Sequence, residues 1–237
     1  MAEGGIAGGL LIAGAPAMGY TLVFSDLLPY WDVLLHGLIF TIVLTIVSTV
    51  AGIALGTAGA SARAFGPKWL DWVVGAYVEV VRNTPFIVQL FFIFFGLPAI
   101  GVKLSETVAA FLAMTINLGA YSTEIIRAGI QAVPKGHIEA GESLAMSRMQ
   151  VLRYVVLKQA FQKIYPALSS QIIIVMLGSA VVSQISAEDL TYAANYIQSR
   201  NFRAFEVYLV VTLLYLLLAI SARAILRGIG RWAFPKA

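Results

Sequence analysis

Residues 131–159 read QAVPKGHIEAGESLAMSRMQVLRYVVLKQ, a polar stretch that lies between two long hydrophobic runs. The stretch carries too many charges to cross a membrane, and it is several times longer than the few residues that usually connect two helices. Val-Pro-Lys-Gly at 133–136 gives a turn signal near its start. An ordered stretch of this length between membrane helices indicates a surface on one side of the membrane that contacts a partner in water.

Two short helices are expected within this stretch. The first covers residues 138–146, and it carries small residues and two acids, Glu139 and Glu142, that share one face. Ser147 and Gln150 have the spacing of a capping box, so a second helix begins directly after Ser147 and the chain bends there. The alternative is a solvated helix that lies on the membrane surface, although its acids would then face an anionic leaflet.

The composition of the chain is that of an integral membrane protein. Of 237 residues, 59% are hydrophobic and only 12% are charged, whereas soluble domains carry about 25% charged residues. The chain has no Cys, which excludes disulfides, thiolate metal sites and a thiol nucleophile. The net charge of +4 comes from loop charges that set the topology, so no nucleic-acid partner is expected.

Five hydrophobic runs are long enough to span about 30 Å of hydrocarbon. A barrel would need alternating strands of about ten residues, so all five are expected to be helices of an all-α polytopic membrane protein. They form a transmembrane domain at 33–226, between an N-terminal segment at 1–32 and a tail at 227–237. Residues 5–24 lack the positive start of a secretory signal, and whether they form a sixth helix stays open. The five runs cover residues 33–59, 72–97, 104–126, 164–185 and 207–225.

The distribution of Lys and Arg predicts the orientation, because cytoplasmic connections are enriched in both residues. One side of the membrane would hold three of them, Lys103, Arg200 and Arg203. The stretch 131–159 and the tail at 227–237 are therefore expected in the cytoplasm, and the N-terminal segment is expected in the periplasm. The opposite side would hold the following twelve: Arg63, Lys68, Arg127, Lys135, Arg148, Arg153, Lys158, Lys163, Arg223, Arg227, Arg231 and Lys236.

A resemblance to the EAA loop of ATP-binding-cassette (ABC) importer permeases is carried by residues 139–161, EAGESLAMSRMQVLRYVVLKQAF. In that family the loop forms a short coupling helix that sits in a cleft of the ATPase subunit. Gly141 stands where the family pattern has a second Ala, Ala145 stands where it has Gly, and Leu-Lys at 157–158 stands where it has Leu-Pro. By resemblance, the residues that couple to the ATPase are Glu139, Ala140, Gly141, Glu142, Ala145 and Arg148.

Three further segments resemble the permeases of the polar amino acid uptake family. Val-Arg-Asn-Thr-Pro at 81–85, with Gln-Leu at 89–90, is similar to their RGTPLLVQL stretch, and AYSTEIIRAGI at 120–130 is similar to AYxAEIxRAGI. Residues 188–206 resemble the segment before their last span. Together the resemblance covers residues 35–225, and it implies a type I importer (MetI-like) fold with five transmembrane helices and a cytoplasmic coupling helix.

The chain has no G-x-x-x-x-G-K-[ST] phosphate loop, so we expect no cofactor in it, and ATP and Mg would be bound by a separate ATPase subunit. The resemblance implies ABC ATPase subunits, a second permease subunit and a periplasmic amino acid-binding protein as partners, besides membrane lipid. It also implies a bacterial inner-membrane location and alternating access around a site near the midplane.

Ionisable residues inside a membrane are costly and often mark a transport path. Arg82 lies about ten residues into the second run, which is about 15 Å deep, and Asn117 lies at a similar depth in the third. We expect Arg82 to bind a substrate carboxylate with help from Thr84, while Asn117 forms a hydrogen bond nearby. The alternative is an Arg82–Glu79 pair that joins helices, with Asn117 as an interhelical hydrogen bond. Pro85 breaks the helical ladder and frees backbone groups to face a cavity.

An amino acid also needs an acceptor for its ammonium group. Glu188 and Asp189 follow the fourth run, and Ser183 lies near its outer end, so these three are candidates. The alternative for the two acids is a solvated periplasmic turn. His36 and His137 lie on opposite sides of the membrane, so no metal site is expected.

The sequence therefore predicts a non-enzymatic permease subunit of an ATP-driven importer for a polar or charged amino acid. Which amino acid it carries, and whether the permease pairs with itself or with a relative, stays open. The competing hypothesis is a passive channel whose cytoplasmic loop binds a regulator. A membrane enzyme is disfavoured, because no metal cluster or nucleophile–base pair is evident in the sequence.

Overall fold

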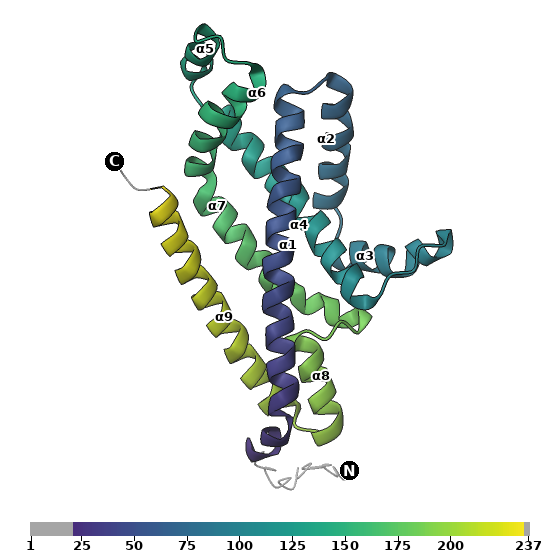
Figure 1. Ribbon diagram of the computed structural model, residues 1–237. Helices are drawn as coiled ribbons and strands as arrows, with labels where there is room; N and C mark the ends of the chain where they lie inside the picture. Colours follow the sequence, from purple (N-terminus) through teal and green to yellow (C-terminus); the bar gives the residue numbers. More distant parts are fainter. Residues whose placement is uncertain (1–20, 235–237) are drawn as a thin grey trace, which may run out of the picture.

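The computed structural model describes residues 21–234, and these residues form helices without any strand (Figure 1). Five short segments have 3-10 or π geometry. The 3-10 segments are Ser25–Tyr30 before α1, Leu97–Ile100 after α3, and Ser179–Ile185 after α7, and the π segments are Phe92–Gly96 after α3 and Val151–Val156 before α7. The helices are α1 (Trp31–Phe65), α2 (Lys68–Arg82), α3 (Phe86–Phe91), α4 (Glu106–Gln131), α5 (Lys135–Ser143), α6 (Arg148–Gln150), α7 (Leu157–Gly178), α8 (Leu190–Asn201) and α9 (Ala204–Ala233).

Four helical segments in the described chain are long and apolar enough to cross a membrane. They are Ser25–Phe65, Glu106–Gln131, Arg148–Ile185 and Ala204–Ala233, which correspond to four of the five predicted spans. In Figure 1, α5 and α6 lie at one end of the molecule and α8 lies at the other. We call these the elbow end and the far end. Residues 1–32 were expected as one segment, of which 1–20 lie outside the described residues.

The predicted second span, residues 72–97, is wrong as a continuous helix. The pair Lys68–Arg82 and Phe86–Ile100 is bent by 110° at residues 83–85, so it counts as a fifth span only when both arms are taken together. Pro85 has an extended backbone, with φ −62° and ψ 139°, and it has no N–H to continue the ladder. The second arm therefore projects sideways from the bundle, as α3 shows in Figure 1.

The central contact of the bundle joins α1 to α4, which lie side by side (Figure 1). Small buried residues follow α1 at intervals of three or four and allow the two backbones to approach closely. A Cβ at Gly52 would lie 2.9 Å from Leu118, and one at Gly56 would lie 2.4 Å from the Cβ of Ser122. The small residues buried on α1 are Gly37, Thr41, Thr45, Ser48, Gly52, Gly56 and Ala60.

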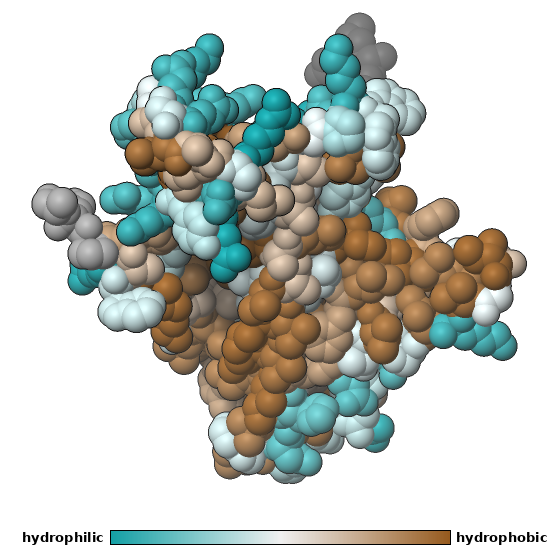
Figure 2. Space-filling view, turned by 45° about the horizontal axis from the view of Figure 1, so that its top comes forward, coloured by the Kyte–Doolittle hydropathy of each residue, from teal (hydrophilic) through white to brown (hydrophobic). Residues whose placement is uncertain are grey.

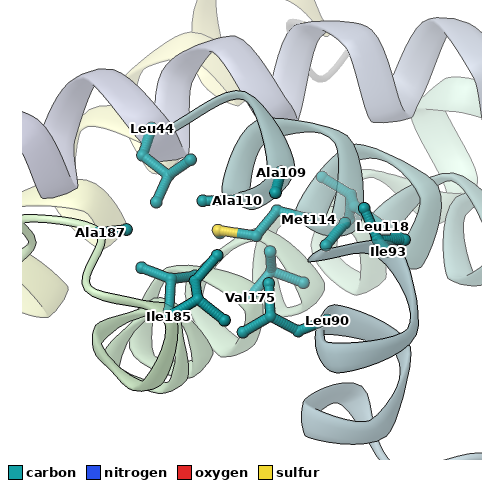
Figure 3. Packing of buried hydrophobic residues seen from close by; sticks show 12 residues of the cluster. Leu44, Leu90, Ile93, Ala109, Ala110, Met114, Leu118, Val175, Ile185 and Ala187 are labelled. Atoms are coloured by element: carbon teal, nitrogen blue, oxygen red, sulfur yellow. The ribbon is translucent and has the colours of Figure 1, made fainter. Parts of the chain in front are cut away.

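An apolar cluster fills the space where α1, α3 and α4 meet the end of α7 (Figure 3). Met114 of α4 lies near its centre, with Leu44 of α1 and Leu90 of α3 on either side. Outside the core, the bundle exposes a broad apolar surface between more polar ends (Figure 2), including Ile46 and Val50 on α1. This surface suits contact with hydrocarbon.

Candidate functional site

The polar stretch folds into an elbow, residues 135–150, in which α5 and α6 are joined by a tight turn. Ala145 has a φ of 54°, in the left-handed region. Met146 N–H donates to the Gly141 carbonyl at 3.2 Å, and Ala145 N–H donates to the Glu142 carbonyl at 2.9 Å. These two bonds are the Schellman pattern, which ends a helix with a left-handed residue and usually employs Gly there. The backbone at Ala145 thus explains why the family pattern has Gly at this position.

The capping box predicted from the sequence is confirmed. Gln150 N–H donates to the Ser147 hydroxyl at 3.4 Å, and Ser147 N–H donates to the Gln150 side chain at 2.8 Å. The second helix begins at Arg148, as expected, but the first begins three residues early, at Lys135, and ends three residues early, at Ser143. Pro134 provides the extended backbone before α5, and the left-handed turn ends it.

The predicted coupling residues fall into two groups. Gly141 is buried, and a Cβ there would lie 3.1 Å from the Val151 side chain, so this glycine allows the elbow to fold onto itself. An apolar cluster that includes Ile130, Val151 and Val156 supports the elbow from beneath. The other five side chains are exposed and point away from that cluster: Glu139, Ala140, Glu142, Ala145 and Arg148.

The break between α2 and α3 is held by the side chain of Gln89. Its Nε2 donates to the Val81 carbonyl at 2.7 Å and to the Thr84 hydroxyl at 2.9 Å. Its Oε1 accepts a hydrogen bond from the Asn117 side chain of α4 at 3.0 Å. Thr84 and Asn117, which the sequence predicts to be part of one site, are therefore brought together through Gln89.

Two cavities lie beside this break. The first, of about 360 Å³, is strongly polar and includes Glu79, Arg82 and Tyr121 in its lining. The second, of about 320 Å³, includes Thr84, Asn117, Tyr121 and Gln171. Tyr121 lines both cavities, and we describe the two together as one candidate site. The sequence assigns no role to Tyr121 or Gln171. Gln171 is a polar residue in the predicted span 164–185, and such residues are costly in hydrocarbon, so its position was a signal that could have identified it.

The guanidinium of Arg82 lies 5.4 Å from the centre of the Tyr121 ring. The Arg82–Glu79 ion pair, which was the alternative to a substrate-binding role, does not form among the described residues, although both side chains line the first cavity. Arg82 ends α2, whose fifteen residues place it about 20 Å from the start of that helix. The arginine therefore lies part-way along the bundle.

A separate ionic network closes the elbow side of the first cavity. Arg63 of α1 binds Asp71 of α2 at 2.9 Å and Glu124 of α4 at 3.0 Å, and Glu124 also binds Arg127 at 2.8 Å. Two arginines and two carboxylates balance one another here. The network joins three helices, and the charge of Arg82 stays outside it.

Of the three residues predicted to receive the ammonium group, Glu188 and Asp189 directly precede α8, whereas Ser183 lies in the 3-10 turn Ser179–Ile185, which packs against α3 and α8. Glu188 pairs with His36 at 3.2 Å and lines a third cavity, of about 490 Å³, with Asp32, Tyr192 and other residues. The Ser183 hydroxyl donates to the Ala180 carbonyl at 2.8 Å and is nearly buried. In this conformation none of the three lies in the lining of the Arg82 or Asn117 cavities.

Asp189 is fully buried and caps the N-terminus of α8. Its carboxylate accepts hydrogen bonds from Tyr192 N–H at 2.8 Å and from the Tyr215 hydroxyl at 3.0 Å. Burial raises the pKa of Asp189 to about 6, and the hydrogen bonds from Tyr192 and Tyr215 reduce this shift. Both oxygens are thus occupied by the protein itself, in a position that holds α8 and α9 together.

Comparison with known proteins identifies the family of this chain. Residues 48–234 match the family described as the binding-protein-dependent transport system inner membrane component. The chain is 34% identical over 203 residues to a probable glutamine ABC transporter permease protein, GlnM, of Bacillus subtilis (strain 168), covering 86% of this chain and 92% of that protein. It is 37% identical over 208 residues to the L-cystine transport system permease protein TcyB of the same organism, covering 86% and 89%.

Solved structures agree with this result. A crystal structure of an amino acid ABC transporter with histidines has a TM-score of 0.80 and 37% identity, and the match covers 90% of this chain and 99% of that one. The MetNI methionine ABC transporter in an inward-facing conformation has a TM-score of 0.68 at 23% identity, which shows the same type I importer fold. The chain belongs to the family of binding-protein-dependent transport system inner membrane components, the permease subunits of ABC importers.

Proposed function

We propose that this chain is the permease subunit of an ATP-driven importer that carries a polar or charged amino acid across the bacterial inner membrane. The substrate would bind beside Tyr121, which lines both cavities part-way along the bundle. The proposal depends chiefly on the state of Arg82, which forms no ion pair among the described residues and faces a polar cavity. An uncompensated arginine at this depth suits a ligand that brings its own carboxylate.

The cavity offers groups for both charges of an amino acid. Arg82 would bind the α-carboxylate, and Glu79, in the same lining, would accept the ammonium group. The substrate side chain would extend past Tyr121 into the second cavity, where Asn117 and Gln171 offer hydrogen bonds. An amide-bearing or charged side chain fits this lining better than an aliphatic one, because unpaired polar groups in the cavity would otherwise lose their hydration.

Coupling to ATP would pass through the elbow. Its exposed Glu139, Glu142 and Arg148 present charged groups to water, as a surface for an ATPase subunit requires. The ATPase would bind the ATP and Mg, and its closure would displace the elbow and rock the helices between inward and outward states. The elbow end and the C-terminus would be cytoplasmic and the N-terminus periplasmic. A second permease subunit and a periplasmic amino acid-binding protein would complete the transporter.

The test uses the permease purified with its ATPase subunits and a screen of amino acids for stimulation of ATP hydrolysis and for direct binding. Arg82→Gln should weaken binding of the best amino acid by about ten-fold to a hundred-fold, since a charge-assisted hydrogen bond contributes about 1.5–3 kcal/mol. Arg200→Gln is the matched control, because Arg200 also lies over a tyrosine ring, that of Tyr196 at 4.1 Å, but outside both cavities. Unchanged affinity in Arg82→Gln would favour a purely structural role for Arg82. Uptake into liposomes without ATP would support the channel hypothesis instead.

A further inference from the structure

Three arginines form a row along the C-terminal part of α9. Arg223, Arg227 and Arg231 follow one another at intervals of four residues, so they share one side of the helix over about 12 Å. All three are exposed. We call them the arginine row. The row lies beyond the predicted hydrophobic run 207–225 or at its edge, at the depth where a helix leaves the hydrocarbon.

The arginine row has no protein partner among the described residues, a property that it shares only with Arg148 of the elbow among the arginines of residues 21–234. Within residues 21–234, Arg63, Arg127 and Arg203 form ion pairs, whereas three others lie over tyrosine rings: Arg82, Arg153 and Arg200. For the arginine row, the described residues provide neither a carboxylate nor an aromatic ring. Fifteen N–H donors, five on each side chain, are thus left to a ligand or to water.

The surroundings of the arginine row show what kind of ligand fits. Tyr165 of α7 holds this part of α9: its hydroxyl donates to the Leu226 carbonyl at 2.7 Å, and a Cβ at Gly230 would lie 2.4 Å from its ring. Arg227 and Arg231 directly follow these two contact positions. The row therefore borders the line where α9 meets α7, within the part of α9 that reaches toward the elbow end (Figure 1).

Another side of the same helix segment is apolar and exposed. Ile225 is 63% exposed, Ile229 is 47% exposed and Trp232 is 85% exposed. Such side chains suit acyl chains and the membrane interface, where Trp is enriched. Because these apolar side chains lie on the opposite face from the arginines and at the same depth, they place this part of α9 at the edge of the hydrocarbon, where the arginine row meets the level of the lipid phosphates.

We propose that the arginine row is a binding site for anionic phospholipid, with the guanidinium groups on the phosphodiester of the head group. Arginine matches phosphate oxygens in a two-pronged geometry, and basic sites between membrane helices recognise such head groups. The lipid would anchor the end of α9, which Tyr165 holds to α7. This inference does not depend on which substrate the permease carries.

The test is native mass spectrometry and thermal unfolding of the permease assembled with its ATPase subunits, in nanodiscs of phosphatidylcholine, alone or mixed with phosphatidylglycerol or with cardiolipin. The parent protein should retain bound anionic lipid and unfold at a higher temperature in both mixtures. Inorganic phosphate in the buffer should produce no such shift. The triple variant Arg223→Gln, Arg227→Gln, Arg231→Gln should lose about five-fold in lipid affinity per arginine, about a hundred-fold in all.

Two matched variants keep the test decisive. Replacement of Lys68, Lys135 and Lys158 by Gln removes the same charge from other exposed positions and should leave lipid binding unchanged. Replacement of the arginine row by lysines keeps the charge and the topology, and should retain most of the binding. Equal lipid retention by the parent and the glutamine variant would overturn the proposal and leave the arginines a role in topology only. Loss of the ATPase subunits from the glutamine variant, with lipid retained, would assign the row to the ATPase.

Discussion

The Arg82 guanidinium lies 5.4 Å from the centre of the Tyr121 ring, so the cation that ends α2 is positioned by an aromatic side chain of α4 rather than by a carboxylate. A carboxylate partner would neutralise Arg82 and lower its attraction for a substrate anion. A ring positions the guanidinium and leaves the charge in place. Because Tyr121 also lines the neighbouring cavity, one residue orients the cation and borders the space beside it.

Replacement of Tyr121 by Leu should weaken amino acid binding to the purified transporter by about two-fold to thirty-fold, because a cation–π contact contributes about 0.5–2 kcal/mol. Tyr121→Phe retains the ring and should bind nearly as the parent does. Isothermal titration with the amino acid found in the screen measures both. Tyr196→Leu, which removes the equivalent ring beneath Arg200, is the control. Equal losses in Tyr121→Leu and Tyr121→Phe would show that the hydroxyl matters and the ring does not.

Replacement of Gln89 by Leu should destabilise the break between α2 and α3. The change removes donors to Val81 and Thr84 and the acceptor for Asn117, and it leaves half-buried polar groups without partners, at a cost of about 1–3 kcal/mol. Thermal unfolding in detergent should show a lower midpoint. Asn117→Ala breaks only one of these bonds and should have a smaller effect. A Gln89→Leu protein as stable as the parent would mean that Pro85 alone fixes the bend.

Replacement of Ala145 by Gly should stabilise the elbow by about 0.5–1 kcal/mol, because Ala145 occupies the left-handed region at φ 54° and glycine has no Cβ to oppose it. Ala140→Gly, in the helical part of α5, should destabilise by a similar amount, since glycine there only adds chain entropy. Hydrogen exchange of the elbow amides reports both changes locally. Faster exchange in Ala145→Gly would show that the turn is not left-handed in solution.

Replacement of Gly56 by Ala should destabilise the contact between α1 and α4 by about 1–3 kcal/mol, because the new methyl group would lie 2.4 Å from the Cβ of Ser122. Ser122→Gly removes that Cβ and should restore part of the loss in the double variant. Gly228→Ala is the control, since nothing lies within 4 Å of its would-be Cβ. Thermal unfolding of the parent, Gly56→Ala, Ser122→Gly and the double variant measures the coupling between the two positions. Additive changes in stability would argue against direct contact between residues 56 and 122.

Replacement of Asp189 by Asn should raise stability at neutral pH. Burial raises the pKa of Asp189 from 3.8 to about 6, so the folded protein favours the neutral acid. The contribution of the Asp189 carboxyl group to the free energy of unfolding is fully present below pH 4. About 3 kcal/mol of it is lost as the pH rises through 6, because the buried group must then ionise. Asn accepts from Tyr192 N–H at any pH, so the advantage of the variant should grow between pH 4 and pH 7. Glu188→Gln, at an exposed neighbour, is the control. An advantage that shrinks with pH would contradict the raised pKa.

Features that depend on neighbouring residues were predictable from the sequence. Ser147 and Gln150 lie three residues apart, so the capping box and the start of α6 needed no information from elsewhere in the chain. The four long helices followed from hydropathy alone. The break at Pro85 was expected to free backbone groups, but its angle was not predictable, because the bend depends on Gln89 and on its contact with Asn117, twenty-eight residues further along.

The candidate site was predicted in part for the same reason. Depth in a span identified Arg82 and Asn117, and the structure places both at adjoining cavities. Asp189 was expected to face a substrate, but its environment depends on Tyr215, twenty-six residues away on another helix. An Arg82–Glu79 pair was the alternative that sequence spacing offered, whereas the observed neighbour of Arg82 is a ring that only the packing of α4 brings near.

The interlocked surface between α1 and α4 limits how the protein can change shape. A helix slides past its neighbour in steps of about one turn, 5.4 Å, and each step requires side chains to clear one another. Where Gly56 lies against Ser122 there is no clearance, so α1 and α4 must move as a single rod. Only three residues separate α4 from α5, so a force applied to the elbow would be transmitted to α4 and would tilt α1 and α4 together. With α1 about 50 Å long, a few degrees of tilt would shift its opposite tip by several ångströms.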